Sequence, residues 1–112
     1  LTTIGVKQWQ APVYDSRHDS AKINLTAAMQ HLGQLQLNEV WLEAGARLAG
    51  AFIKEQLVDE FILYRAPKVM GHKASSLLEL TEFSTMAEVP ELEILDTNMV
   101  GPDIKLTTRF KY

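Results

Sequence analysis

The chain has 112 residues, of which 46% are hydrophobic and 22% are charged, and its formal net charge is −3. This composition is that of an ordinary globular domain, and the acidic balance argues against a nucleic-acid-binding or anionic-membrane-binding surface. The sequence contains no cysteine, which excludes disulfides and thiolate metal sites, and no apolar run approaches the roughly 20 residues that a membrane helix needs. We therefore expect one cytoplasmic domain over residues 1–112, without a membrane or nucleic-acid partner.

The N-terminal third of the chain predicts a short strand, a loop and a helix. β-Branched residues favour a strand over residues 1–6, and residues 7–20 lack a steady period and read as a loop. In that loop Trp9 and Tyr14 are expected to cover apolar surface, with stacking on a ligand as the less favoured alternative. Asn24 is a suitable N-cap for a helix whose apolar stripe consists of Leu25, Ala28, Met29, Leu32 and Leu35. His31 falls beside this stripe and is expected at the surface.

The middle of the chain predicts a strand–helix–strand unit. Residues 40–42 form a short apolar run that suits a strand buried on both faces, and residues 44–46 are small where the backbone must turn. From Arg47 the apolar period becomes helical, and residues 61–64 form a second apolar strand. The length of this unit predicts that the two strands are parallel neighbours.

A ligand is expected at the start of the helix in this unit. Unpaired N–H groups near residues 45–48 and the helix dipole favour an anion there, and Glu43 adds a carboxylate at the end of the first strand. Arg47 in the first turn opposes the dipole unless an anion compensates. Alternatively, Gly45 only turns the chain and Gly50 only eases packing. Spacing alone slightly favours this alternative, because short glycine motifs match by chance.

The C-terminal part predicts an antiparallel hairpin. Pro67 requires the strand at 61–64 to end, bulge or become an edge, and residues 75–89 are an ambiguous, looping segment. His72 has no carboxylate nearby in sequence that would suggest a metal site. Residues 91–100 and 104–112 read as paired strands joined by a tight turn. The second strand alternates, with one face formed by Ile104, Leu106, Thr108, Phe110 and Tyr112. Together with the central unit, the hairpin predicts an α/β fold with a mixed, mostly parallel sheet and flanking helices.

Several short motifs occur together in the order of one known family. They are Val-Trp-Leu-Glu-Ala-Gly at 40–45, Leu-Ala-Gly-Ala at 48–51, Leu-Val-Asp-Glu at 57–60, Ala-Pro-Lys at 66–68 with Gly71, and Val-Gly-Pro-Asp at 100–103. Over roughly residues 22–110 the chain thus resembles the C-terminal part of the reductase domain of the riboflavin-biosynthesis bifunctional deaminase–reductase. The set is much more specific than the glycine turn alone, and it reverses the preference for the packing alternative.

The resemblance implies a dihydrofolate-reductase-like three-layer fold and an NADPH-dependent oxidoreductase. The implied reaction reduces the ribosyl group of 5-amino-6-(5-phosphoribosylamino)uracil to ribityl. By the same resemblance, Glu43 contacts the substrate, and the cofactor phosphates are wrapped by the backbone of Gly45, Ala46, Arg47, Leu48, Ala49, Gly50 and Ala51. Many family members have Pro-Thr where this chain has Ala46-Arg47, which puts side-chain contacts there in doubt but not backbone contacts. Nothing identifies the catalytic proton donor, and no metal is implied.

The resemblance also shows what this chain lacks. The first half of the family's reductase domain and its N-terminal deaminase domain are absent, so we expect the parent protein to be the enzyme and this chain alone to be inactive. Because the alternating hairpin leaves an edge free, we expect a homodimer. Two alternatives stay open: a non-catalytic dimerisation or assembly module of the same fold, and a related reductase acting on another substrate.

Overall fold

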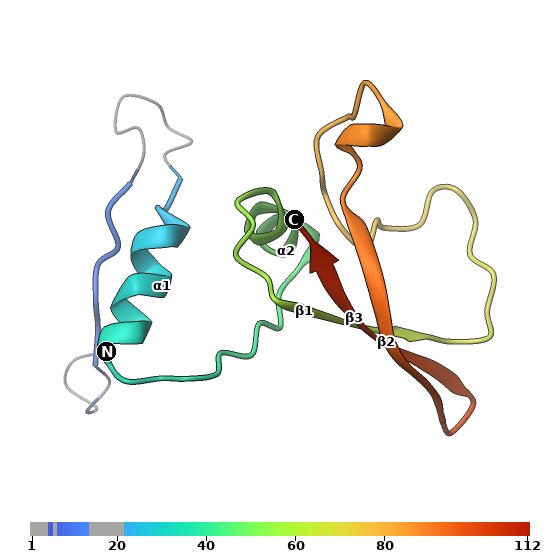
Figure 1. Ribbon diagram of the computed structural model, residues 1–112, viewed down its shortest axis with the longest axis horizontal. Coiled ribbons are helices and arrows are strands. Elements are labelled where there is room, and N and C mark those ends of the chain that lie inside the picture. Colours follow the sequence, from blue (N-terminus) through green and yellow to red (C-terminus); the bar gives the residue numbers. More distant parts are fainter. Residues whose placement is uncertain (1–4, 6, 14–21) are drawn as a thin grey trace. The chain divides into compact units, whose positions relative to one another are not determined.

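The computed structural model describes residues 5, 7–13 and 22–112. Its elements, in chain order, are α1 (Leu25–Gln34), α2 (Ala46–Lys54), β1 (Glu60–Arg65), the 3-10 helix η2 (Met86–Glu88), β2 (Glu91–Val100) and β3 (Asp103–Lys111) (Figure 1). The chain divides into two compact units, Leu1–Trp41 and Leu42–Tyr112. The single-domain organisation stays a prediction.

The first unit is built around α1, whose start is fixed by Asn24. The Ala27 N–H donates to the Asn24 side-chain oxygen Oδ1 at 3.0 Å, as expected of an N-cap. The Asn24 N–H donates to the Pro12 carbonyl at 2.8 Å, and Val13 forms an antiparallel bridge with Ile23. Pro12 and Val13 are therefore joined by backbone contacts to Ile23 and Asn24, directly before α1. The predicted N-cap is confirmed.

An aromatic stack joins the same segment to α1. The Trp9 and His31 rings are nearly parallel, with an interplanar angle of 4° and centroids 4.2 Å apart. Trp9 covers the imidazole of His31 and leaves this surface residue half-buried. Tyr14, His18 and nearly all of the strand expected at 1–6 lie outside the described residues.

Both α-helices end in the same way, with a glutamine in the left-handed region. Gln36 has φ 61° and Gln56 has φ 56°. After each one a leucine N–H reaches back to a carbonyl in the last turn: Leu37 to Leu32 at 3.4 Å and Leu57 to Phe52 at 3.0 Å. This closing pattern usually uses glycine, because a side chain in that conformation costs about 1–2 kcal/mol.

The second unit contains a three-stranded antiparallel sheet in the order β1-β3-β2. β2 and β3 form the predicted C-terminal hairpin, which turns at Gly101 with φ 58°. The pairing of β2 with β3 shifts by one residue between Ile94 and Asp96, so Leu95 forms a β-bulge. In Figure 1 these two strands run side by side as a long twisted ribbon.

The two faces of this sheet differ in chemistry, and the registers assign each side chain to a face. On the polar face, Arg109 lies opposite Glu60 of β1 and Glu93 of β2, and Lys111 lies opposite Glu91. Such cross-strand charge pairs each contribute a few tenths of a kcal/mol and favour this register. The other face is largely apolar and consists of Phe61, Leu63, Arg65, Leu92, Ile94, Thr97, Met99, Ile104, Leu106, Thr108 and Phe110.

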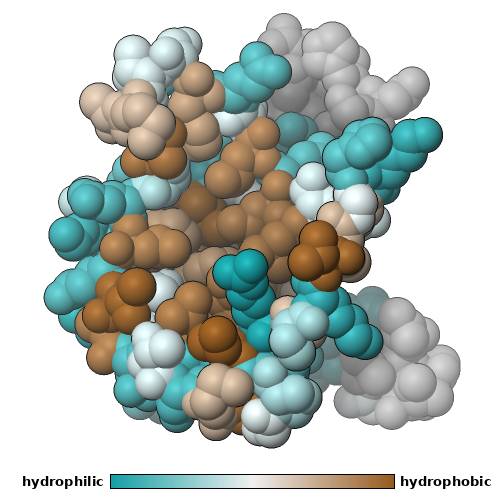
Figure 2. Space-filling view, turned by 90° about the vertical axis from the view of Figure 1, so that its right-hand side faces the viewer, coloured by the Kyte–Doolittle hydropathy of each residue, from teal (hydrophilic) through white to brown (hydrophobic). Residues whose placement is uncertain are grey.

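Only one end of the apolar face is covered. Phe110 and Thr108 are buried there, and the Thr108 hydroxyl donates to the Phe61 carbonyl at 2.7 Å. Ile94, which lies opposite Thr108, is exposed, and so are Met99 and Ile104 near the hairpin turn. Figure 2 shows apolar side chains gathered on the side of the molecule that carries the hairpin.

The predicted parallel strand pair is wrong. Residues 40–43 form no strand, and β1 pairs with β3 in the antiparallel sense, so the described residues form no mixed or mostly parallel sheet. A parallel strand needs cover on both faces. Val40, Trp41 and Leu42 are instead exposed, so this segment lacks the burial that a central strand requires.

Candidate functional site

The start of α2 is an open helix N-terminus. Gly45 is the N-cap, so the helix begins where the sequence predicted, directly after the small-residue turn. Gly45 has no side chain that could cap the first turn, and that turn contains no acidic residue. The N–H groups of the first turn therefore have no intrahelical acceptor, and with the helix dipole they favour an anion at this position.

The absence of a side chain at Gly45 matters for space and not for backbone conformation. With φ −69° and ψ 172°, Gly45 has an extended conformation that any residue can adopt. A Cβ built on it would meet no heavy atom within 4 Å, so the space in front of the helix start is open. A ligand can approach the backbone here without displacing a neighbouring side chain.

The backbone around Glu79 lies against α2 at Ala46 and Gly50. The Glu79 N–H donates to the Ala46 carbonyl at 3.0 Å, and a Cβ on Gly50 would overlap the carbonyl oxygen of Glu79. Gly50 is buried by this contact. Gly50 therefore does ease packing, as the sequence suggested. The segment that packs on it is the loop before η2 and not a strand.

The seven residues expected to wrap a cofactor lie together on the first two turns of α2 but differ in accessibility. Gly45, Arg47 and Leu48 are exposed, while Ala46, Ala49 and Ala51 are half-buried. Glu43 is also exposed and lies two residues before the N-cap. An incoming anion would therefore meet the turn at Gly45 and the first helical turn, with the Arg47 guanidinium available on the surface.

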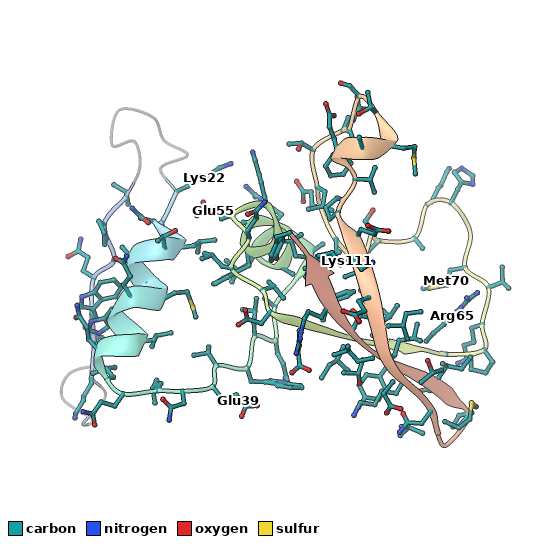
Figure 3. All side chains as sticks on the ribbon, in the orientation of Figure 1. Lys22, Glu39, Glu55, Arg65, Met70 and Lys111 are labelled. Carbon is teal, nitrogen blue, oxygen red and sulfur yellow. The ribbon has the colours of Figure 1, made fainter. Side chains whose placement is uncertain are left out.

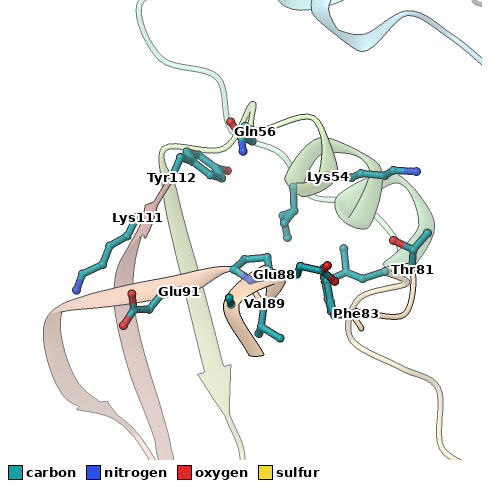
Figure 4. Close-up of a pocket in the computed structure, with 13 residues that line it drawn as sticks. Lys54, Gln56, Thr81, Phe83, Glu88, Val89, Glu91, Lys111 and Tyr112 are labelled. Carbon is teal, nitrogen blue, oxygen red and sulfur yellow. The ribbon is translucent and has the colours of Figure 1, made fainter. Parts of the chain in front are cut away.

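A cavity of about 360 Å³ lies near the C-terminal end of α2 (Figure 4), and no sequence pattern predicted it. Its walls come from the end of α2, the segment around η2 and the end of β3. They include Ile53, Lys54, Phe83, Glu88, Lys111 and Tyr112. With nine residues, α2 is about 13 Å long, so this cavity is separate from the Gly45 turn. Residues from three distant segments line it, which no local sequence pattern reveals.

Tyr112 closes the sheet against the segment that follows α2. Its hydroxyl donates to the Val58 carbonyl at 2.9 Å. Burial raises the pKa of the Tyr112 phenol above its ordinary value, and the nearby Asp59 charge raises it further, while the Val58 hydrogen bond acts in the opposite direction. The phenol is therefore neutral at physiological pH.

Two further findings concern the described part of the chain. No three histidine, aspartate or glutamate side chains there come together as a metal-binding group. None of its helices is long and apolar enough to span a membrane.

The fold and the site thus define an α/β protein with an antiparallel sheet and an open, anion-favouring helix start. The family described as the RibD C-terminal domain matches residues 2–106 of the chain. This match covers most of the sequence, and the chain belongs to that family.

Curated relatives agree with this assignment. The riboflavin biosynthesis protein RibD of Haemophilus influenzae is 42% identical over 83 residues, which are 74% of this chain and 22% of the relative. The 5-amino-6-(5-phosphoribosylamino)uracil reductase of Buchnera aphidicola is 38% identical over 76% of this chain and 41% of its own length. The chain therefore spans less than half the length of these relatives.

A solved structure is also similar. RibD of Acinetobacter baumannii, form 2, superimposes with a TM-score of 0.73 at 35% identity. The superposition covers 78% of this chain and 25% of the RibD chain. Most of this chain thus has a counterpart in a RibD structure.

Proposed function

We propose that this chain is the C-terminal part of an NADPH-dependent reductase of riboflavin biosynthesis. The reductase would reduce the ribosyl group of 5-amino-6-(5-phosphoribosylamino)uracil to ribityl. Family membership supports this proposal, and so does the reductase activity for which the Buchnera relative is named. For the complete reductase domain we propose the dihydrofolate-reductase-like three-layer fold, a cytoplasmic location and, in the parent, an N-terminal deaminase domain.

The open helix start is the observation that carries the proposal. Its uncapped N–H groups, the open space at Gly45 and the exposed Arg47 fit a phosphate group, so the residues present suit NADPH. When bound, NADPH would supply the hydride that reduces the open-chain sugar carbonyl. The role of this chain is to hold the phosphates through the backbone of residues 45–51. Gly50 contributes from behind, by letting the Glu79 backbone support the helix.

Glu43 is proposed to hold the substrate. A carboxylate beside a phosphate site would repel a second phosphate, so Glu43 is better suited to accept hydrogen bonds from ribose hydroxyls. Such charge-assisted hydrogen bonds are typically worth about 1.5–3 kcal/mol.

The test is Glu43→Gln in the complete enzyme that contains this chain. Loss of the charged acceptor should lower kcat/KM for the phosphoribosylaminouracil roughly ten- to a hundredfold, while the Kd for NADPH changes little. Glu39→Gln, at a second exposed glutamate nearby in sequence (Figure 3), is the matched control and should leave both values unchanged. If Glu43→Gln lowers the melting temperature and leaves the kinetics intact, Glu43 is a structural residue and not a substrate ligand.

A second candidate function is a non-catalytic assembly module, and the free edge of β2 favours it. NADPH titration of this chain and of an N-terminally extended chain separates the two. The reductase proposal expects tight binding and turnover in the extended chain, weak binding in this chain and no turnover from this chain alone. An extended chain without NADPH affinity would support the module. Affinity and turnover with a different pyrimidine or pteridine would instead indicate a related reductase. We also propose that the protein is a homodimer.

A further inference from the structure

Residues 80–90, here called the arch, lie beside the C-terminal end of α2 and are attached at their two ends. Before the arch, the Glu79 N–H donates to the Ala46 carbonyl, and after it Glu91 pairs with Lys111 in the sheet. Between these points the backbone of the arch donates only within itself, around η2, in the described part of the chain. The arch is therefore not hydrogen-bonded to α2, and the cavity of about 360 Å³ lies between them.

The cavity has a largely apolar and aromatic wall. Its apolar lining includes Ile53 from α2 and Leu80, Phe83 and Val89 from the arch. The Tyr112 ring also lines the cavity and is stacked on Phe110, with ring centroids 5.3 Å apart. Ligand pockets have volumes of about 300–1,000 Å³ and combine apolar walls with a few polar groups. The cavity is at the small end of this range, so it suits a compact molecule such as a single ring.

The charged side chains around the cavity differ in direction. In Figure 4 the Lys54 and Lys111 side chains extend away from the cavity, whereas the Glu88 carboxylate lies among the lining residues. Lys111 also lies opposite Glu91 in the sheet, so these two charges offset each other. Glu88 Oε2 accepts the Ser84 N–H at 2.8 Å, which holds the carboxylate in place. Because a carboxylate can accept several hydrogen bonds, Glu88 can also accept one from a ligand.

Two further features favour positive charge in the cavity. The dipole of a helix places partial negative charge at its C-terminus, and α2 ends at Lys54, beside the cavity. The faces of aromatic rings attract cations, and Phe83 and Tyr112 supply two rings. Lys54, the basic residue in the last turn of α2, extends away in Figure 4 and leaves the cavity open.

We propose that this cavity is a binding site for a small organic cation, an ammonium group on a compact apolar body. The apolar body packs against Ile53, Leu80 and Phe83, and the ammonium donates a hydrogen bond to Glu88. The site is separate from the turn at Gly45, because the nine residues of α2 span about 13 Å. The two ends of α2 thus bind opposite charges, and the proposal does not depend on the reductase function.

A pair of probes tests the preference for a cation. Phenethylamine carries an ammonium at neutral pH, whereas hydrocinnamate carries a carboxylate at the end of a similar chain on the same ring. Amide chemical shifts of the isotopically labelled chain should show that phenethylamine binds at least about tenfold more tightly than hydrocinnamate. The shifts should be largest at residues 53–56 and in the arch. Equal affinities, no binding of the amine, or shifts centred on residues 45–48 would each overturn the proposal.

Matched glutamine variants test the role of Glu88. Glu88→Gln removes the charge but keeps an oxygen for the Ser84 N–H, and it should weaken phenethylamine binding about three- to tenfold. Glu82→Gln makes the same change at an exposed glutamate of the arch that does not line the cavity, and it should leave the affinity unchanged. Equal effects of the two variants would contradict the assignment of the ammonium to Glu88.

Filling the cavity tests the position of the site. Ala87 lines the cavity and is exposed, so Ala87→Phe should place a ring there and abolish phenethylamine binding. Ala74→Phe, on the exposed loop after β1, is the control and should bind the amine as the parent chain does. A folded Ala87→Phe variant, as judged by circular dichroism, that keeps the parent affinity would refute the proposal. If Ala87→Phe does not fold, the comparison of Glu88→Gln with Glu82→Gln decides.

Discussion

Replacing Gly50 by alanine tests the contact that supports the proposed phosphate site from behind. In a helix with free space, alanine is more stable than glycine by about 1 kcal/mol. Here the added Cβ would overlap the Glu79 carbonyl oxygen, which belongs to the backbone and cannot rotate away. The helix and the loop must therefore move apart, and the hydrogen bond from Glu79 N–H to the Ala46 carbonyl is strained or lost.

The expected change in the free energy of unfolding follows from these opposing effects. Overpacking of a close contact costs about 1–3 kcal/mol, and the lost hydrogen bond costs about 0.5–1.5 kcal/mol. After the gain of about 1 kcal/mol in helix propensity, Gly50→Ala should lower the free energy of unfolding by roughly 1–3 kcal/mol. The amide of Glu79 should also exchange its hydrogen faster in the variant, because its acceptor has moved.

Gly33→Ala is the matched control. Gly33 is a helical glycine of α1, and a Cβ built on it meets nothing within 4 Å. The same substitution there should stabilise by about 0.5–1 kcal/mol. Urea unfolding followed by far-UV circular dichroism measures both variants, and amide exchange reports on Glu79. If Gly50→Ala is as stable as the parent and Glu79 keeps its protection, the close contact does not hold α2 in place.

Two further changes have expected outcomes. Tyr112→Phe tests the raised pKa of the phenol. Because the folded state favours the neutral phenol, Tyr112 contributes stability below the ordinary pKa of 10.0, and this contribution is lost as pH rises through the higher pKa of the folded state. Above pH 10, the free energy of unfolding of the variant should therefore fall less steeply with pH than that of the parent. Equal slopes would contradict this. Gln36→Gly should stabilise the protein by about 0.5–1 kcal/mol in thermal unfolding, because the φ of 61° at this position suits glycine. A destabilised variant would show that the Gln36 side chain contributes more to stability than its backbone conformation costs.

Local signals in the sequence were reliable. The Asn24 cap, the helix that starts after Gly45 and the alternating hairpin all depend on residues close together in the chain. At each of these points a short pattern selects one backbone conformation with few competitors. These are also the features that place the proposed phosphate site.

The errors came from contacts between distant residues. The apolar run at 40–42 has the composition of a buried strand, but composition does not say whether two covering layers exist. The contact between Gly50 and Glu79 was signalled only by a glycine in the middle of a helix, which shows that something approaches closely but not what it is. The bulge at Leu95 had no glycine to mark it.

The attachment of Glu79 to α2 has a consequence for how sequences of this kind can change over evolution. Between the end of β1 and this attachment, residues 66–77 are exposed and irregular. Doubling the length of such a loop costs only about 0.6 kcal/mol of closure entropy. Insertions and deletions can accumulate there without disturbing the helix. From Glu79 onward the chain lies against α2 and lines the cavity near the end of this helix. An insertion or deletion of even one residue there would shift the contacts that follow. Length variation among related chains should therefore stop abruptly at this residue.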